Sequence, residues 1–123
     1  MKKICCALLS ILILTILFTG CSNNANAGLQ MRSYVFEDSA DEIMKPSVTL
    51  EDGNKFSFYY SAFSSYRPIG MYEVDNNTLT LIPDDELNNI YVFEIANETL
   101  IFDAEKSSEI PLFASIPDRA VFK

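Results

Sequence analysis

The segment YEVDNNTLTL at residues 72–81 is repeated, with related residues, as FEIANETLIF at residues 93–102. Both copies follow the order aromatic, Glu, β-branched, a turn around Asn, then Thr-Leu and a second apolar residue. Alternating apolar and polar residues on either side of a short turn predict a β-hairpin. Two such hairpins at an offset of 21 residues predict an antiparallel meander. Its apolar face would hold Tyr72, Val74, Leu79 and Leu81 with their repeat equivalents.

Further short strands are expected on both sides of the repeat. Upstream, Val48 and Leu50 alternate with polar residues, 52–55 form a turn signal, and 56–62 alternate again. Downstream, the apolar tail at 110–122 is expected to return as strands that cover the sheet, with its prolines confined to edges. The sequence therefore predicts a mainly β fold built from a meander of repeated hairpins. Because a sheet must cover its apolar face, this meander is expected to close into a small barrel or sandwich.

The chain begins with a targeting signal. Lys2 and Lys3 precede an apolar run over residues 4–19, which is expected as a signal helix. The end of this run and the two residues after it read Phe18-Thr19-Gly20-Cys21. This FTGC resembles the lipobox of bacterial lipoprotein precursors, with Phe18 where that family usually has Leu. The resemblance implies that the Cys21 thiol receives diacylglycerol and that the chain is cut between Gly20 and Cys21. The alternative is an uncleaved anchor with an incidental cysteine, but the following SNNANAG lacks the basic residues of a stop-transfer boundary.

Three segments follow from this reading of the chain. Residues 1–20 are the expected lipoprotein signal peptide, 21–33 a flexible polar tether, and 34–123 one β-rich extracytoplasmic domain. Cys5 and Cys6 would leave with the signal, so Cys21 is the only thiol of the mature chain and no intramolecular disulfide is possible. The expected location is the extracytoplasmic face of the cell membrane, where two acyl chains anchor stably.

Charge and composition exclude several classes of function. The formal charge is −8, and without Lys2 and Lys3 it becomes −10, so nucleic-acid binding is not expected. The sequence has no histidine, which removes Ser-His and Cys-His pairs and the commonest metal ligand. Glu73 and Glu94 are equivalent in the repeat but are expected on the solvent face. No enzyme activity, metal or cofactor is therefore predicted.

One aromatic-rich zone is a candidate binding site. Its residues surround a loop and would offer rings and a guanidinium for stacking on a glycan or a peptide. The candidate ligand-binding residues are Tyr59, Tyr60, Tyr66, Arg67 and Tyr72. The alternative is that these side chains form the core and rim of the β domain.

Residues 56–111 resemble an extracytoplasmic domain of Gram-positive bacteria. The matching segments are YYSAFSSYRPIGMYEVDNNTLTL, YVFEIANETLIFDAEKSSEIP and the C-terminal IPDRAVFK. That domain lies at the C-terminus of membrane metallopeptidases of the antirepressor, β-lactam sensor-transducer type, and in small secreted or lipidated proteins. The metallopeptidase motif belongs to a membrane domain absent from this sequence, so the resemblance implies only an accessory or sensing β domain.

Two functions are therefore expected from the sequence. The first is a membrane-anchored lipoprotein whose non-enzymatic domain binds a cell-envelope ligand: cell-wall material, a small amphiphile in the barrel mouth, or a membrane sensor protein. The second is a structural or inhibitory lipoprotein that acts through protein contacts at a strand edge. A pocket lined by the aromatic zone would favour the first function, and a filled interior with a flat apolar edge would favour the second.

Overall fold

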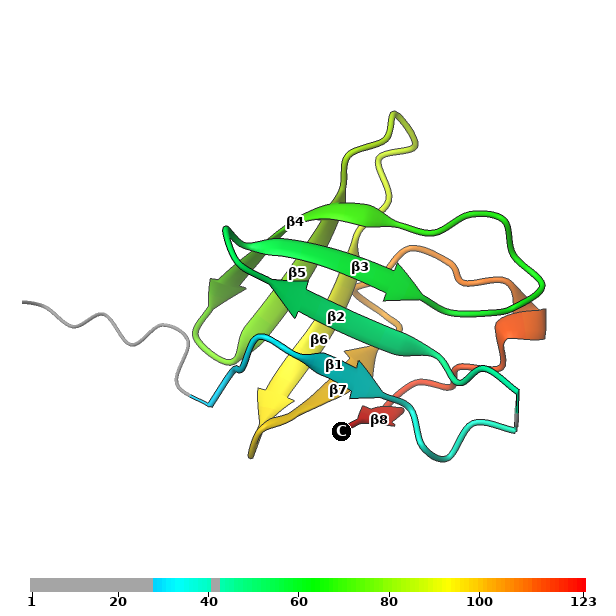
Figure 1. The fold of residues 1–123 in the computed structure, drawn as a ribbon, viewed down its shortest axis with the longest axis horizontal. Coiled ribbons are helices and arrows are strands. Elements are labelled where there is room, and N and C mark those ends of the chain that lie inside the picture. The colour runs from blue at the N-terminus through cyan, green and yellow to red at the C-terminus, as the bar shows by residue number, and fades with distance from the viewer. Residues whose placement is uncertain (1–27, 41–42) are drawn as a thin grey trace, which may run out of the picture.

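The structure is a computed structural model and describes residues 28–40 and 43–123. The expected signal helix and Cys21 lie outside these residues. The described chain forms eight strands and a 3₁₀ turn, η2 (Leu112–Ala114) (Figure 1). The strands are β1 (Ser33–Val35), β2 (Ser47–Glu51), β3 (Lys55–Tyr59), β4 (Ile69–Asp75), β5 (Thr78–Pro83), β6 (Tyr91–Ala96), β7 (Thr99–Asp103) and β8 (Val121–Phe122).

The eight strands form one meander that returns to its start. Each strand pairs antiparallel with the next one in the chain, in the order β1 to β8. The Val35 N–H donates to the Lys123 carbonyl at 2.8 Å, and the Lys123 N–H donates to the Val35 carbonyl at 2.9 Å. These two bonds join β1 to the chain end beyond β8, so the sheet forms a nearly closed barrel. The predicted β fold and meander are confirmed, and of the two expected closures the barrel is the one observed.

The repeated sequence forms the two central hairpins. In β4–β5 and β6–β7, Val74 pairs with Leu79 and Ile95 with Leu100, around two-residue turns. Asn76 and Asn97 take the positive φ of 54° and 49° that such turns require. The predicted inward face is confirmed, since its repeat positions are buried or half-buried: Tyr72, Val74, Leu79, Leu81, Phe93, Ile95, Leu100 and Phe102.

Aromatic rings fill the barrel interior. Phe58, Phe93 and Phe122 are fully buried and meet edge to face, with the Phe93 ring centroid 5.8 Å from that of Phe58 and 5.3 Å from that of Phe122. Edge-to-face pairs are the favoured arrangement of aromatic side chains. The same cluster includes inward side chains from every strand, among them Tyr34, Val48, Leu50, Phe56, Tyr72, Leu81 and Tyr91. The described interior is therefore a packed core.

The tail departs from the sequence prediction. Only Val121–Phe122 pairs as a strand, whereas the covering strands expected over 110–117 do not form. Pro111 and Pro117 lack the N–H that a sheet ladder needs, and Ser115 adopts a left-handed φ of 52° at the end of η2. This segment instead forms part of a long connection between β7 and β8.

The alternation of strand directions gives the barrel two unlike ends (Figure 1). At the end where the described chain enters, short turns at 52–54, 76–77 and 97–98 join the strands, and the Arg32 guanidinium donates to the Glu98 carbonyl at 3.1 Å. We call this the turn end. At the opposite end, called the loop end, lie the four long connections: 36–46, 60–68, 84–90 and 104–120.

Candidate functional site

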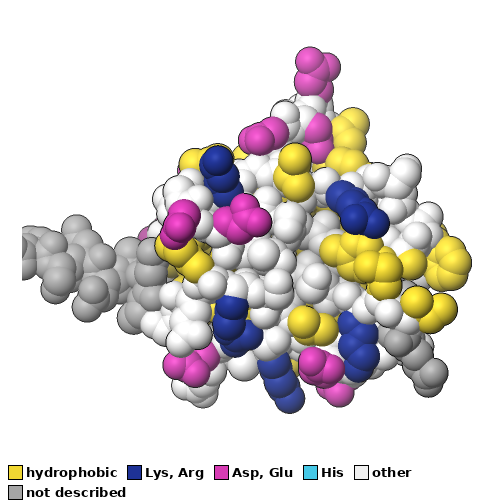
Figure 2. Space-filling model, in the orientation of Figure 1, with side chains coloured by type: hydrophobic (Ala, Val, Ile, Leu, Met, Phe, Trp, Pro, Cys, Tyr) yellow, Lys and Arg dark blue, Asp and Glu magenta, His cyan; other side chains and the backbone are white. Residues whose placement is uncertain are grey.

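The loop end carries most of the exposed large apolar side chains. Of the eleven found among the described residues, seven belong to its connections: Ile43, Met44, Phe63, Leu87, Ile90, Leu112 and Phe113. Leu112 is 97 % exposed and Phe63 is 83 % exposed. Figure 2 shows apolar side chains grouped on the side where Figure 1 places η2. Because soluble proteins rarely leave such side chains together in water, this end is the candidate interaction surface.

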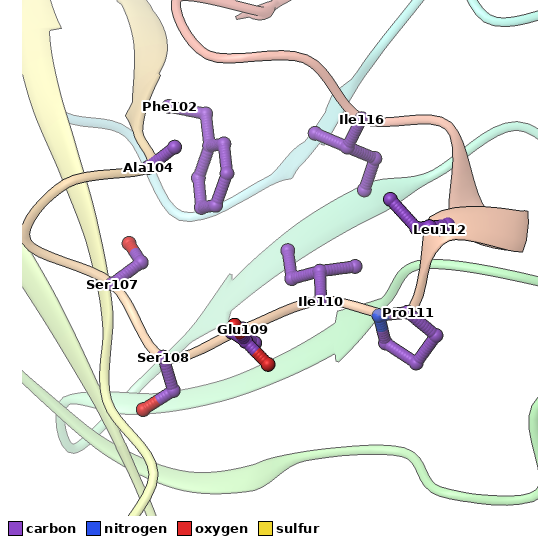
Figure 3. Close-up of a pocket in the computed structure, with 9 residues that line it drawn as sticks. All are labelled: Phe102, Ala104, Ser107, Ser108, Glu109, Ile110, Pro111, Leu112 and Ile116. Carbon is purple, nitrogen blue, oxygen red and sulfur yellow. The ribbon is translucent and has the colours of Figure 1, made fainter.

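A cleft of about 610 Å³ lies beneath the β7–β8 connection (Figure 3). Phe102 lines one side of it, and Ile110 and Ile116 point into it from opposite sides. Its remaining lining comes from Ala104, Ser107, Ser108, Glu109, Pro111 and Leu112. An adjoining hollow of about 380 Å³ shares Ile110, Leu112 and Ile116. The two together make an open, mainly apolar depression, within the size range of ligand sites.

Two serines hold the start of the β7–β8 connection in place. The Ser107 hydroxyl accepts a hydrogen bond from the Val92 N–H at 2.8 Å and donates to the Asp103 carbonyl at 2.6 Å. The Ser108 hydroxyl accepts from the Ile90 N–H at 2.9 Å. Both hydroxyls therefore accept a hydrogen bond within the fold. The cleft offers a ligand apolar side chains, the Glu109 carboxylate and the O–H of Ser108.

The candidate aromatic zone is divided by the structure. Tyr59 faces outward, with the Arg67 guanidinium 5.0 Å from its ring centroid. Tyr60 and Tyr66 lie at the loop end with ring centroids 6.4 Å apart. Tyr72 is buried in the core, where its electrostatic neighbours are Tyr34 and Asp52. The five residues thus do not form one stacking platform.

A cluster of phenols joins two of the long connections. The Tyr66 hydroxyl donates to the Asp85 carboxylate at 2.5 Å, and burial, followed by this bond, raises the pKa of Tyr66. Burial also raises the pKa of Tyr91, with further contributions from Tyr66 and Tyr60. A phenol with a raised pKa stays protonated at neutral pH, so these groups act as hydrogen-bond donors and not as bases. The sequence did not indicate that Tyr91 and Asp85 belong to this cluster, because only the folded barrel brings them close to Tyr66.

The two repeat-equivalent glutamates lie on the solvent face, as expected. Glu73 and Glu94 are both exposed on the outer side of the sheet. Arg119 pairs with Glu94 at 2.7 Å, and this hydrogen bond raises the pKa of the Arg119 guanidinium. Glu94 is thus engaged at the surface in holding the end of the β7–β8 connection.

Comparison of the chain with protein-family models, with curated proteins and with solved structures gave no match. Within residues 28–40 and 43–123, no three Asp, Glu, Cys or His side chains are grouped as metal ligands. The described part of the chain also has no helix long and apolar enough to cross a membrane. The geometry of the loop end is therefore the main basis for a functional proposal.

Proposed function

We propose that this chain is a lipid-anchored, non-enzymatic binding domain that holds a cell-envelope partner at its loop end. Cys21 is the anchor, and the turn end faces the membrane. The observation that carries the proposal is the difference between the two ends of the barrel. The described chain enters at the turn end, whereas the long connections and most exposed apolar side chains lie at the other end.

Contacts near the first described residues support this orientation. The Gln30 N–H donates to the Tyr34 hydroxyl at 2.8 Å, and the Arg32 guanidinium lies 4.0 Å from the Tyr34 ring centroid. Leu29 packs against the core. Leu29, Gln30 and Arg32 therefore contact the barrel at its turn end. Cys21 precedes Gly28 by seven residues in the sequence, a length of chain that spans at most about 25 Å, so an anchor at Cys21 would hold the turn end near the headgroups.

Packing of the barrel favours a partner at the loop end over the other expected modes. The interior formed by the described residues is packed with buried side chains, which argues against an amphiphile in the barrel mouth. The alternative, binding of a protein at an unpaired strand edge, is less favoured because the Val35–Lys123 hydrogen bonds join the edges of β1 and β8. Leu112 and Phe63 are highly exposed apolar side chains at the loop end, of the kind that anchor protein interfaces. An accessory or sensing role through protein contact follows.

Photo-crosslinking in the producing cells tests this proposal. A photoreactive residue at Leu112 or Phe63 of the full chain is expected to give adducts of defined mass, because these positions would touch the partner. The same residue at Asn76 or Asn97, in the tight turns, serves as the matched control and is expected to give none. Adducts of equal yield from both ends, or no adduct from the loop end, would contradict the proposal.

A further inference from the structure

We propose that the cleft beneath the β7–β8 connection binds a cationic amphipathic peptide segment. One apolar side chain of that segment packs between Ile110, Leu112 and Ile116, and a neighbouring Lys or Arg pairs with Glu109. The inference rests on the proposed function, since it names the chemistry of the partner that the loop end holds.

The apolar part of the peptide matches the walls of the cleft. Ile110 and Ile116 point into one space beside Phe102, with Leu112 at its edge (Figure 3). Leu112 is almost fully exposed and so has nearly all of its side-chain surface left to bury. Burial of one Leu-sized side chain strengthens binding by roughly ten- to a hundredfold. Pro111 and Pro117 restrict the backbone around this space, so little ordering is needed when a ligand enters.

The charged part of the peptide matches the rim. Ser107 and Ser108 use their hydroxyls within the fold, as described above. Glu109 is exposed and has no ion-pair partner among the described residues. The charged group of the cleft lining is thus a carboxylate, which selects an ammonium or guanidinium group.

The charge of the loop end excludes the competing occupants. Its four connections hold ten acidic and four basic residues in the sequence. Lys45, Lys106 and Arg119 are paired with carboxylates, and Arg67 lies over Tyr59. Such a field attracts cations and repels both an anionic lipid surface and a second copy of this acidic chain. A cationic peptide remains as the occupant.

The test uses the full lipidated chain in nanodiscs of zwitterionic lipid. The probe is a synthetic amphipathic peptide of Leu and Lys with one Trp, whose emission is read without background because the chain contains no Trp. We expect saturable binding with a blue shift that weakens as salt is added. A matched peptide with Glu in place of each Lys is expected not to bind, and empty nanodiscs correct for peptide partition into lipid.

Variants locate the site on the protein. Leu112→Ser is expected to weaken binding about tenfold or more, and Glu109→Gln by about two- to fivefold, with a smaller salt dependence. Both residues are exposed, so the fold should not change. Leu87→Ser and Glu86→Gln, on the neighbouring 84–90 connection, are the matched controls and are expected to change affinity less than about twofold.

Equal binding of the two peptides, or unchanged binding by Leu112→Ser, would overturn the inference. Preferential binding of the loop end to vesicles of anionic lipid would overturn it in favour of a membrane surface. If the peptide fails to bind while loop-end crosslinks persist in cells, the cleft assignment is wrong and the proposed function stands. If the crosslinks come from the turn end, both are wrong.

Discussion

Replacement of Gly70 by Ala is expected to destabilise the protein by about 3 kcal/mol or more. Gly70 lies inward on β4, opposite Pro83 of β5. A Cβ there would lie 2.2 Å from the Ile82 carbonyl oxygen and 2.9 Å from the Asp84 nitrogen. Both are backbone atoms, so no side-chain rotation relieves the clash. In the variant β4 and β5 must move apart, which would strain the adjacent hydrogen bond from the Asp84 N–H to the Ile69 carbonyl, 2.8 Å long in the parent protein.

Gly53→Ala is the matched control for this substitution. Gly53 has a φ of +75° but no atom within 4 Å of the added Cβ, so its replacement costs only backbone strain of about 1 kcal/mol. Urea denaturation of both variants measures the two free energies of unfolding. A loss at Gly70 no larger than that at Gly53 would mean that β4 and β5 do not approach as closely as the structure has them.

Replacement of Phe93 by Ala is expected to lower the free energy of unfolding by about 3–5 kcal/mol. The side chain is fully buried, and its ring contacts those of Phe58, Phe102 and Phe122 at centroid distances of 5.8, 5.4 and 5.3 Å. A domain of this size is stable by about 5–15 kcal/mol, so the variant should lose a large part of its stability. Thermal melting followed by circular dichroism should show a Tm lower by more than about 10 °C.

Phe63→Ala provides the comparison for that variant. Phe63 is an exposed loop-end residue, so its truncation opens no cavity and should change the Tm by only a few degrees. Equal melting temperatures of the Phe93 and Phe63 variants would contradict a barrel interior filled by aromatic rings.

The hairpins could be predicted from the sequence because their signals are local. The hairpin expected over 72–81 is observed as strands Ile69–Asp75 and Thr78–Pro83, and the one expected over 93–102 as strands Tyr91–Ala96 and Thr99–Asp103. Alternation with a period of two and an Asn-centred turn lie within ten residues of each other, so no distant contact is needed to read them. Burial of the inward face followed from the same alternation.

The closure of the barrel and the shape of the loop end could not be predicted from local sequence patterns. Closure depends on Val35 meeting Lys123, two residues at opposite ends of the described chain. The β7–β8 connection is apolar in composition, but Pro111 and Pro117 prevent it from pairing as strands. The position of these two prolines on either side of Leu112 and Phe113 is the sequence feature that indicates an exposed apolar loop.

The candidate aromatic zone shows the limit of reasoning from composition. Tyr59 and Tyr60 are neighbours in the chain, yet adjacent residues of an extended segment point to opposite faces. Tyr59 accordingly lies outside with Arg67, and Tyr60 lies inside near Tyr66. Tyr72 follows the inward pattern of the repeat and joins the core. These neighbours in the sequence therefore divide in space into an outer pair, an inner pair and one core residue.

Energy transfer to the membrane tests the two-ended barrel most directly. Cys21 is the expected sole thiol of the mature chain and is expected to be acylated, so a cysteine at Asn97→Cys or Leu112→Cys alone accepts a fluorophore. The parent chain should take no label, which serves as the control. With acceptors in the lipid headgroups, the two positions differ in height by roughly 20 Å, because six strand residues span about that length.

We expect strong transfer from a donor at position 97, in the β6–β7 turn, and weak transfer from a donor at position 112, in η2. That result would place the turn end at the membrane and leave the apolar loop end free for a partner. Equal transfer from both positions, or stronger transfer from position 112, would contradict it.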